Sequence, residues 1–375
     1  MNFACLSSQQ IPVVADTDIL IIGGTTQAVS FALAAKRSGA SVYLIAPRAY
    51  LGEDICAAYR YWPERISDNE LAEKVFVSKG DPPTPMHVKL TLEQSLIEEN
   101  IPFLLYCFSG GILKNETGRI CGAVIANRSG HQAIRAKLVV DATLEGRVLR
   151  QAGCGNIHVL SGEQIVPYVA LCEGEGAEAE GTERVELLPG YNSEDYALSA
   201  RRYHVKTDFG SGSSAELARA FSSVVEACWV PSEYRHQTVL TTQRVRSDRK
   251  PAVEELMVTE GLLAMTESMS LPGGAETVFA DPVTAMTYAE SLAPEVCRRL
   301  QNSSVGKISV ECAGAEAIGK GTIRTLRDAL RPGAPANEYV RADMTRLPVL
   351  DEFDVVVVGG GTGGAPAAIS SARAG

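Results

Sequence analysis

The sequence predicts an α/β fold in which a parallel sheet, an antiparallel meander and a mixed α+β region follow one another. Three observations predict it. An apolar run enters a glycine turn and a helix near the N-terminus, strand-like segments with polar turns fill residues 103–140, and the first pattern recurs at 354–375. With 375 residues, of which 45% are hydrophobic, the chain can bury a sizeable core.

The first pattern, residues 18–47, has the form of a βαβ unit. The unbroken apolar run at 19–22 predicts a parallel strand buried on both faces. A helix over 26–38 follows from apolar residues at helical spacing, namely Ala28, Phe31, Ala32 and Ala35. Gly39 suits the helix end, and residues 41–47 predict the second strand. Such a Rossmann-like unit directs free N–H groups and a positive helix end at one place, which suits a pyrophosphate.

The glycine fingerprint G-x-G-x-x-G is incomplete in this unit. Its three positions are Gly23, Thr25 and Ala28, with Gly24 and Thr26 between them. Alanine at the third position still permits close packing of helix on strand, whereas Thr25 puts a side chain where backbone should approach phosphates. Ala46 and Pro47 stand where an acidic residue would bind the ribose. The unit is therefore either a cofactor site or one that has lost its nucleotide.

Residues 354–375 repeat residues 18–39 without a gap, and here the fingerprint is complete as Gly359, Gly361 and Gly364. This repeat predicts the beginning of a second nucleotide-binding domain after a strand at 355–358. The chain then reads as the N-terminal fragment of a longer tandem protein, with domains at 1–155, 156–348 and 349–375.

The stretch "YLGEDICAAYRYW" (50–62), the strands of 103–140 and "AKLVVDATLEGRVLRQAG" (136–153) follow the βαβ unit in order. This order resembles the FAD-dependent oxidoreductases of the glutathione-reductase-like flavoprotein class, related to heterodisulfide reductase A. The resemblance implies FAD as the cofactor. It also implies contacts to FAD from the loop and from the returning strand: Leu51, Gly52, Glu53, Asp141, Ala142 and Thr143. Glu53 and Leu144 replace glycines of the family pattern.

Residues 156–348 carry no motif, although 215–229 has the spacing of an amphipathic helix. In the family this region is the substrate domain. The glycine-rich strand and helix that complete such a cofactor site are not recognisable in it. Arg60, just beyond the loop, is the first candidate for contact with a flavin or an anionic substrate. His204 and His236 are the candidates for proton transfer, because neighbouring basic residues would keep an imidazole neutral.

The leading interpretation is an FAD-dependent oxidoreductase that transfers hydride or electrons to or from a small organic substrate. The alternative is a degenerate, cofactor-free copy that serves as a structural or regulatory half for a C-terminal flavin domain of the same longer chain. A NAD(P)-binding domain fits the βαβ unit but not the meander or the D-A-T strand.

Charge and composition narrow the partners and the compartment. A formal charge of −10 and a pI near 5.2 argue against nucleic acid and anionic membranes. The chain has no apolar run of about 20 residues that would span a bilayer. The nine cysteines lack metal-ligand spacing, so we expect no metal and a cytoplasmic protein.

Overall fold

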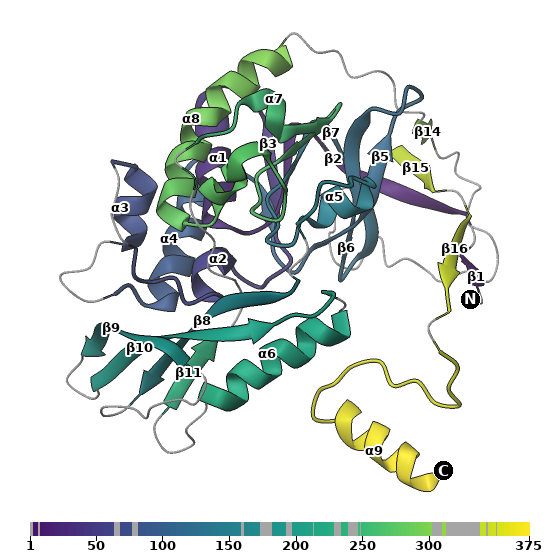
Figure 1. Cartoon of the computed structure of the whole chain (residues 1–375). Coiled ribbons are helices and arrows are strands. Elements are labelled where there is room, and N and C mark those ends of the chain that lie inside the picture. Colours follow the sequence, from purple (N-terminus) through teal and green to yellow (C-terminus); the bar gives the residue numbers. More distant parts are fainter. Residues whose placement is uncertain are drawn as a thin grey trace.

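The computed structural model describes residues 3–6, 8–63, 68–76, 82–158, 161–172, 182–192, 197–212, 214–228, 234–238, 247, 249–301, 310–312, 338–342, 344–349 and 351–375. Two sheets dominate the fold, and each has its own helical cover (Figure 1). The α/β class predicted by the sequence is confirmed.

The first sheet has a parallel core with the strand order β4–β3–β2–β7–β13. Residues 19–22, at the end of β2, are at most 2% exposed, because sheet neighbours and helices cover them on all sides. This burial explains the unbroken apolar run, which a strand with one solvated face would not need. The strand bounds are β2 Gln9–Ile22, β3 Val42–Ile45, β4 Phe103–Leu104, β7 Gly130–Asp141 and β13 Leu262–Ala264.

Helices α1 (Thr26–Arg37) and α8 (Pro282–Gln301) lie side by side on this sheet (Figure 1). Ser30 of α1 donates a hydrogen bond of 2.8 Å to the carbonyl of Met286, which links the two helices. Helices α3 (Glu70–Phe76) and α4 (Pro85–Glu98) pack beside them. Gly39, with φ of +89°, follows α1 in the left-handed conformation expected just after a helix end.

The predicted meander is confirmed from residue 108 onward, whereas residues 103–104 form β4, which pairs parallel with β3 instead of joining the meander. Strands β5 (Phe108–Lys114) and β6 (Ile120–Asn127) pair antiparallel, and β6 pairs antiparallel with β7. Polar turns connect them, and the short helix α5 (Arg147–Gln151) follows β7. The returning strand β7 therefore belongs to the meander at its start and to the parallel sheet at its end.

Residues 253–301 return to the first sheet, although the sequence shows no recognisable closing segment there. After α7 (Val253–Leu256), β12 (Met257–Thr259) turns back antiparallel into β13, and β13 pairs parallel with β7. The 3₁₀ helix η1 (Pro272–Phe279) leads from there to α8. A strand and a helix that return to the first sheet are thus present in this chain. The division of the chain at residue 155 stays a proposal, with the region around β8–β11 inserted before this return.

The second sheet is antiparallel, with the order β11–β8–β10–β9, and α6 (Ser214–Cys228) covers one face (Figure 1). Its core joins the inward side chains Tyr168, Tyr203 and Phe209 to Val224 of α6. The sequence spacing that predicts a helix over 215–229 is confirmed. The strands are β8 Glu163–Cys172, β9 Thr182–Asn192, β10 Ala197–Asp208 and β11 Tyr234–Thr238.

The terminal segments lie together at one end of the first sheet. Strand β15 (Glu338–Ala342) pairs with β14 (Val310–Cys312) and with the start of β2, and β1 (Phe3–Leu6) pairs with β16 (Thr345–Pro348). The strand predicted at 355–358 is wrong: these valines form no strand, and Val358 is 96% exposed. A parallel strand of this kind needs neighbours on both sides, and the described residues supply none here. Helix α9 (Gly364–Ala374) forms as predicted but has no buried residue.

Among the described residues, no helix has the length and apolarity needed to cross a bilayer.

Candidate functional site

The glycine turn between β2 and α1 is held by its two neighbouring strands. Gly23 has φ of +136°, and a Cβ built on it would lie 2.3 Å from the carbonyl oxygen of Ala142 on the returning strand. Its N–H donates to the carbonyl of Ile45, at 2.9 Å. Only glycine fits here, because both the conformation and the contact exclude a side chain. This position of the fingerprint therefore serves the packing of the turn.

Thr25, at the second fingerprint position, is the N-cap of α1. Its hydroxyl accepts a hydrogen bond from the Ala28 N–H at 3.4 Å and donates one to the Ala142 carbonyl at 3.2 Å. The side chain is fully buried and contacts the end of β7. As the sequence indicates, a side chain stands at this position of the turn. It caps the helix and satisfies one of its free amides.

Two carboxylates of α2 (Glu53–Cys56) lie against the same turn. Asp54 accepts hydrogen bonds from the Thr26 N–H at 2.8 Å and from the Thr26 hydroxyl at 2.5 Å. Glu53 accepts a longer bond, 3.4 Å, from the Gly24 N–H. The amide groups expected to attract phosphate are therefore bonded to the chain's own anions.

These carboxyl groups are buried, and burial changes their acidity. Asp54 is 3% exposed and Glu53 is 4% exposed. Burial, followed by the negative charge of Glu145, raises the pKa of Glu53 to about 7. Burial also raises the pKa of Asp54, while its bonds to Thr26 and the nearby charge of Arg60 oppose the rise.

The other residues around the glycine turn are also buried by protein. Ala46 follows β3, is fully buried and offers no group to a ribose. Leu51 and Gly52 are buried beside the turn, and the Gly52 N–H donates to the Gly24 carbonyl at 2.6 Å. Gln27 is 3% exposed, and its amide oxygen has no hydrogen-bond partner among the described residues.

The D-A-T segment at the end of β7 holds helix α5 through hydrogen bonds. Asp141 accepts hydrogen bonds from the N–H and the hydroxyl of Thr143, at 3.0 and 2.7 Å, and from the Leu149 N–H at 2.9 Å. Burial raises its pKa, and these bonds oppose the rise. Asp141 thus bonds within its own loop, while the Ala142 carbonyl contacts Thr25 of the glycine turn.

The three candidate catalytic residues lie on two different units. Arg60 is half-buried beyond α2, with a guanidinium nitrogen 3.4 Å from Glu267 in the loop after β13. The neighbouring Trp62 donates a hydrogen bond of 2.8 Å to the Pro189 carbonyl of β9, which ties the loop to the second sheet. His204 lies on β10, 3.5 Å from Glu186. His236 lies on β11, and its side chain is outside the described residues.

Gly359 and Gly361 are exposed and lie before α9, and Gly364, which is partly exposed, is the first residue of this helix. The structure brings none of them to the first glycine turn, so their role as cofactor ligands stays a prediction.

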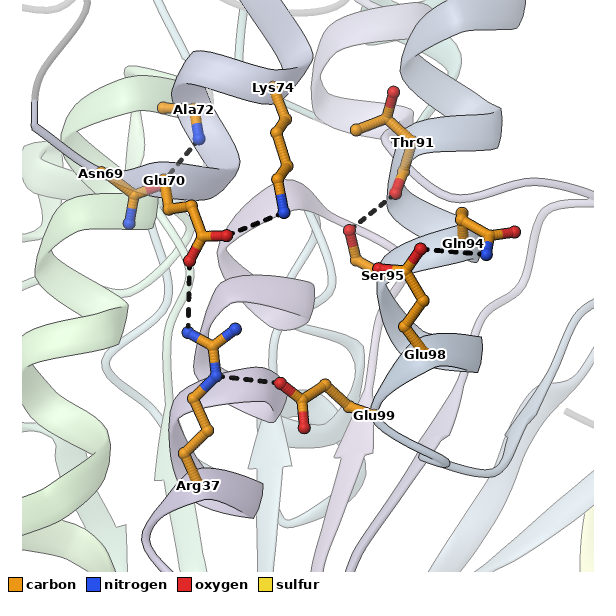
Figure 2. A network of polar contacts seen from close by, with 10 residues as sticks. All are labelled: Arg37, Asn69, Glu70, Ala72, Lys74, Thr91, Gln94, Ser95, Glu98 and Glu99. Atoms are coloured by element: carbon orange, nitrogen blue, oxygen red, sulfur yellow. Dashed lines mark hydrogen bonds and ion pairs between the residues drawn. The ribbon is translucent and has the colours of Figure 1, made fainter.

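The polar network of Figure 2 lies at the other end of α1 from the glycine turn. Arg37 there contacts Glu99 at 3.0 Å and Glu70 at 3.6 Å, and Lys74 contacts Glu70 at 2.8 Å. The hollow beside it is lined by α1, α3, α4 and Glu290 of α8. These side chains are half-exposed and paired, so we interpret them as a surface ion network.

The comparison with known families follows the same segments. Residues 18–159 match the family described as FAD dependent oxidoreductase. This segment, about two fifths of the chain, is similar to the FAD-dependent oxidoreductases. The match includes the βαβ unit, the loop with α2, the meander and the D-A-T strand, and it supports FAD as the cofactor. No curated protein matches the sequence.

Solved structures show a weak likeness over most of the chain. One is a geranylgeranyl bacteriochlorophyll reductase-like protein from Thermoplasma acidophilum, with 15% identity, 76% of this chain and 79% of that chain covered, and a TM-score of 0.46. Another is the flavin-dependent brominase Bmp2, with 13% identity, coverages of 77% and 80%, and a TM-score of 0.47. A third is CabE, an aromatic hydroxylase from angucycline biosynthesis, with 11% identity, coverages of 76% and 63%, and a TM-score of 0.46. At these values the likeness carries no argument about activity.

The side chains as they stand do not fit the diphosphate of FAD at the first glycine turn. Residues 23–27 and 51–54 are all buried by protein. Asp54 and Glu53 hold the Thr26 and Gly24 amides, and both are acidic groups that would face the phosphates. A diphosphate could occupy this place only after the α2 side chains leave it.

Asp54 binds the N–H and the hydroxyl of Thr26, and the sequence analysis does not identify it as a site residue. Its signal is the pair Glu53–Asp54 directly after a glycine, but its partner Thr26 lies 28 residues earlier in the chain.

Proposed function

We propose that this chain serves in FAD-dependent oxidation or reduction of a small organic substrate. The observation that carries the proposal is the family match over 18–159, which includes the strand, turn, helix and returning strand that surround the first glycine turn. Arg60, which follows α2 and contacts Glu267, is the candidate for contact with an anionic group, because a guanidinium can bind a carboxylate or a phosphate through two parallel hydrogen bonds.

Flavin binding by the purified chain tests this proposal. The protein is denatured, refolded with excess FAD and freed of unbound flavin, and its visible spectrum is compared with that of untreated protein. We expect a flavin absorbance band that stays with the protein and disappears on chemical reduction. Failure to retain FAD under any refolding condition, with the far-UV spectrum intact, would overturn the proposal.

A second candidate function is a cofactor-free copy that acts as a structural or regulatory half. The specific observation in its favour is that Asp54 and Glu53 already satisfy the amides of the glycine turn. On this interpretation the variant Thr25→Gly/Ala46→Glu, which restores the second glycine and the ribose-binding acid, would create FAD binding that the wild-type chain lacks. Tight FAD binding by the wild-type chain would reject it.

A further inference from the structure

We propose that α2 is a built-in competitor of the cofactor: Asp54 and Glu53 occupy the diphosphate position at the start of α1, and FAD enters only when they are displaced. This inference rests on the proposed function, because it concerns how the first unit takes up its cofactor.

The hydrogen bonds of Asp54 reproduce those that a phosphate would make. Both carboxylate oxygens are used, one on the Thr26 N–H at 2.8 Å and the other on the Thr26 hydroxyl at 2.5 Å. Thr26 is the first residue of a 12-residue helix, so its amide carries the positive end of the helix dipole. An internal anion and a phosphate cannot both use this amide.

Helix α2 is held in place by the loop residue before it, Gly52. The Gly52 N–H bonds to the Gly24 carbonyl at 2.6 Å, and a Cβ built on Gly52 would lie 2.8 Å from Leu92 of α4. The loop is therefore pressed between the glycine turn and α4. Displacing the carboxylates requires either a rotation of the two side chains or a shift of the four-residue α2 away from the turn.

The local charge also opposes a diphosphate while α2 is in place. The negative charges of Glu145 and Asp54 act on Glu53, and the half-exposed Arg48 lies 3.6 Å from its carboxylate. Arg60 lies near Asp54 but is shared with Glu267. A diphosphate would add negative charge beside buried carboxyl groups. The electrostatic cost of binding it therefore comes mainly from repulsion by the two acids of α2.

Thr25 is a separate obstacle and can be distinguished from α2. Its hydroxyl points to the Ala142 carbonyl of β7, whereas Asp54 bonds to the next residue, Thr26. Removing the Thr25 side chain therefore leaves the Asp54 contact intact. If α2 is the competitor, Thr25→Gly alone changes FAD affinity little.

The experiment measures dissociation constants of FAD and of ADP, its adenosine diphosphate half, by isothermal titration calorimetry on the full chain. The variants are Asp54→Asn, which weakens the bond to Thr26, and Glu53→Gln, which leaves that bond untouched. Glu73→Gln, an exposed acid of α3, is the matched control. We expect both α2 variants to bind FAD and ADP at least about tenfold more tightly than wild type, and the control to equal wild type.

The outcomes separate the two proposals. Equal affinity of wild type and both α2 variants for FAD would overturn the competitor and leave the proposed function standing. A gain in Thr25→Gly without a gain in Asp54→Asn would also overturn it, because the obstacle would then be Thr25. If no variant binds FAD or ADP, both the competitor and the proposed function fail.

Discussion

Replacing Glu53 with glutamine should change how the stability of the protein depends on pH. Glu53 is 4% exposed, its carboxylate accepts a long bond of 3.4 Å from the Gly24 N–H, and Arg48 lies 3.6 Å away. Burial raises its pKa from 4.5 to about 7. A pKa difference of one unit corresponds to about 1.4 kcal/mol. Ionised Glu53 therefore lowers the free energy of unfolding by about 3 kcal/mol relative to the protonated form.

The direction follows from proton binding in the two states. Well below pH 4.5 the carboxyl is protonated in both the folded and the unfolded chain, so it contributes no difference. Between 4.5 and about 7 the unfolded chain loses this proton and the folded chain keeps it. The unfolding free energy of the wild type therefore falls across this window and stays lower above it.

Glutamine does not titrate. The unfolding free energy of Glu53→Gln minus that of wild type should therefore be larger at about pH 8 than at about pH 4.5, by up to about 3 kcal/mol. The assay is reversible urea unfolding followed by tryptophan fluorescence at several pH values, with Glu73→Gln as the control. Using the difference between variant and wild type removes the titration of other groups. A difference that does not change with pH would refute the burial argument.

Three further outcomes follow from the same site. Asp54→Ala should lower the unfolding free energy by about 2–4 kcal/mol, because the buried N–H and hydroxyl of Thr26 lose their carboxyl acceptor. Asp54→Asn should lower it less, because an amide oxygen can still accept a hydrogen bond, and equal losses in urea unfolding would contradict this role of Asp54. Gly23→Ala should cost more than about 3 kcal/mol, since its Cβ would lie 2.3 Å from the Ala142 carbonyl oxygen, and a wild-type melting temperature would contradict this. Burial raises the pKa of Cys56 to about 11, so iodoacetamide at about pH 8 should label it far more slowly than glutathione, as intact-mass spectrometry can follow.

The parts of the fold that depend on local periodicity are predictable from the sequence. The run at 19–22, the helix stripe through Phe31 and the turns of the meander each carry their signal within a few residues, and the structure confirms them. Strand β13 has three residues and no glycine motif, so nothing local marks its pairing with β7.

The site is less predictable, because its decisive contacts join distant segments. Asp54 meets Thr26 across 28 residues, and Arg60 meets Glu267 across 207. The run at 355–358 shows the opposite case: its sequence favours a strand, but a strand forms only where a neighbour pairs with it, and Val358 remains exposed. The roles of Gly359 and of His236 remain predictions.

A crystal structure of the wild-type chain before and after soaking with ADP would test the occupancy of the glycine turn most directly. We predict that without nucleotide the Asp54 carboxylate bonds to the Thr26 amide, and that phosphate oxygens reach this amide only in molecules where that carboxylate has moved away. A diphosphate seated on the Gly24 and Thr26 amides beside an unmoved Asp54, or nucleotide bound at another place on the chain, would contradict it.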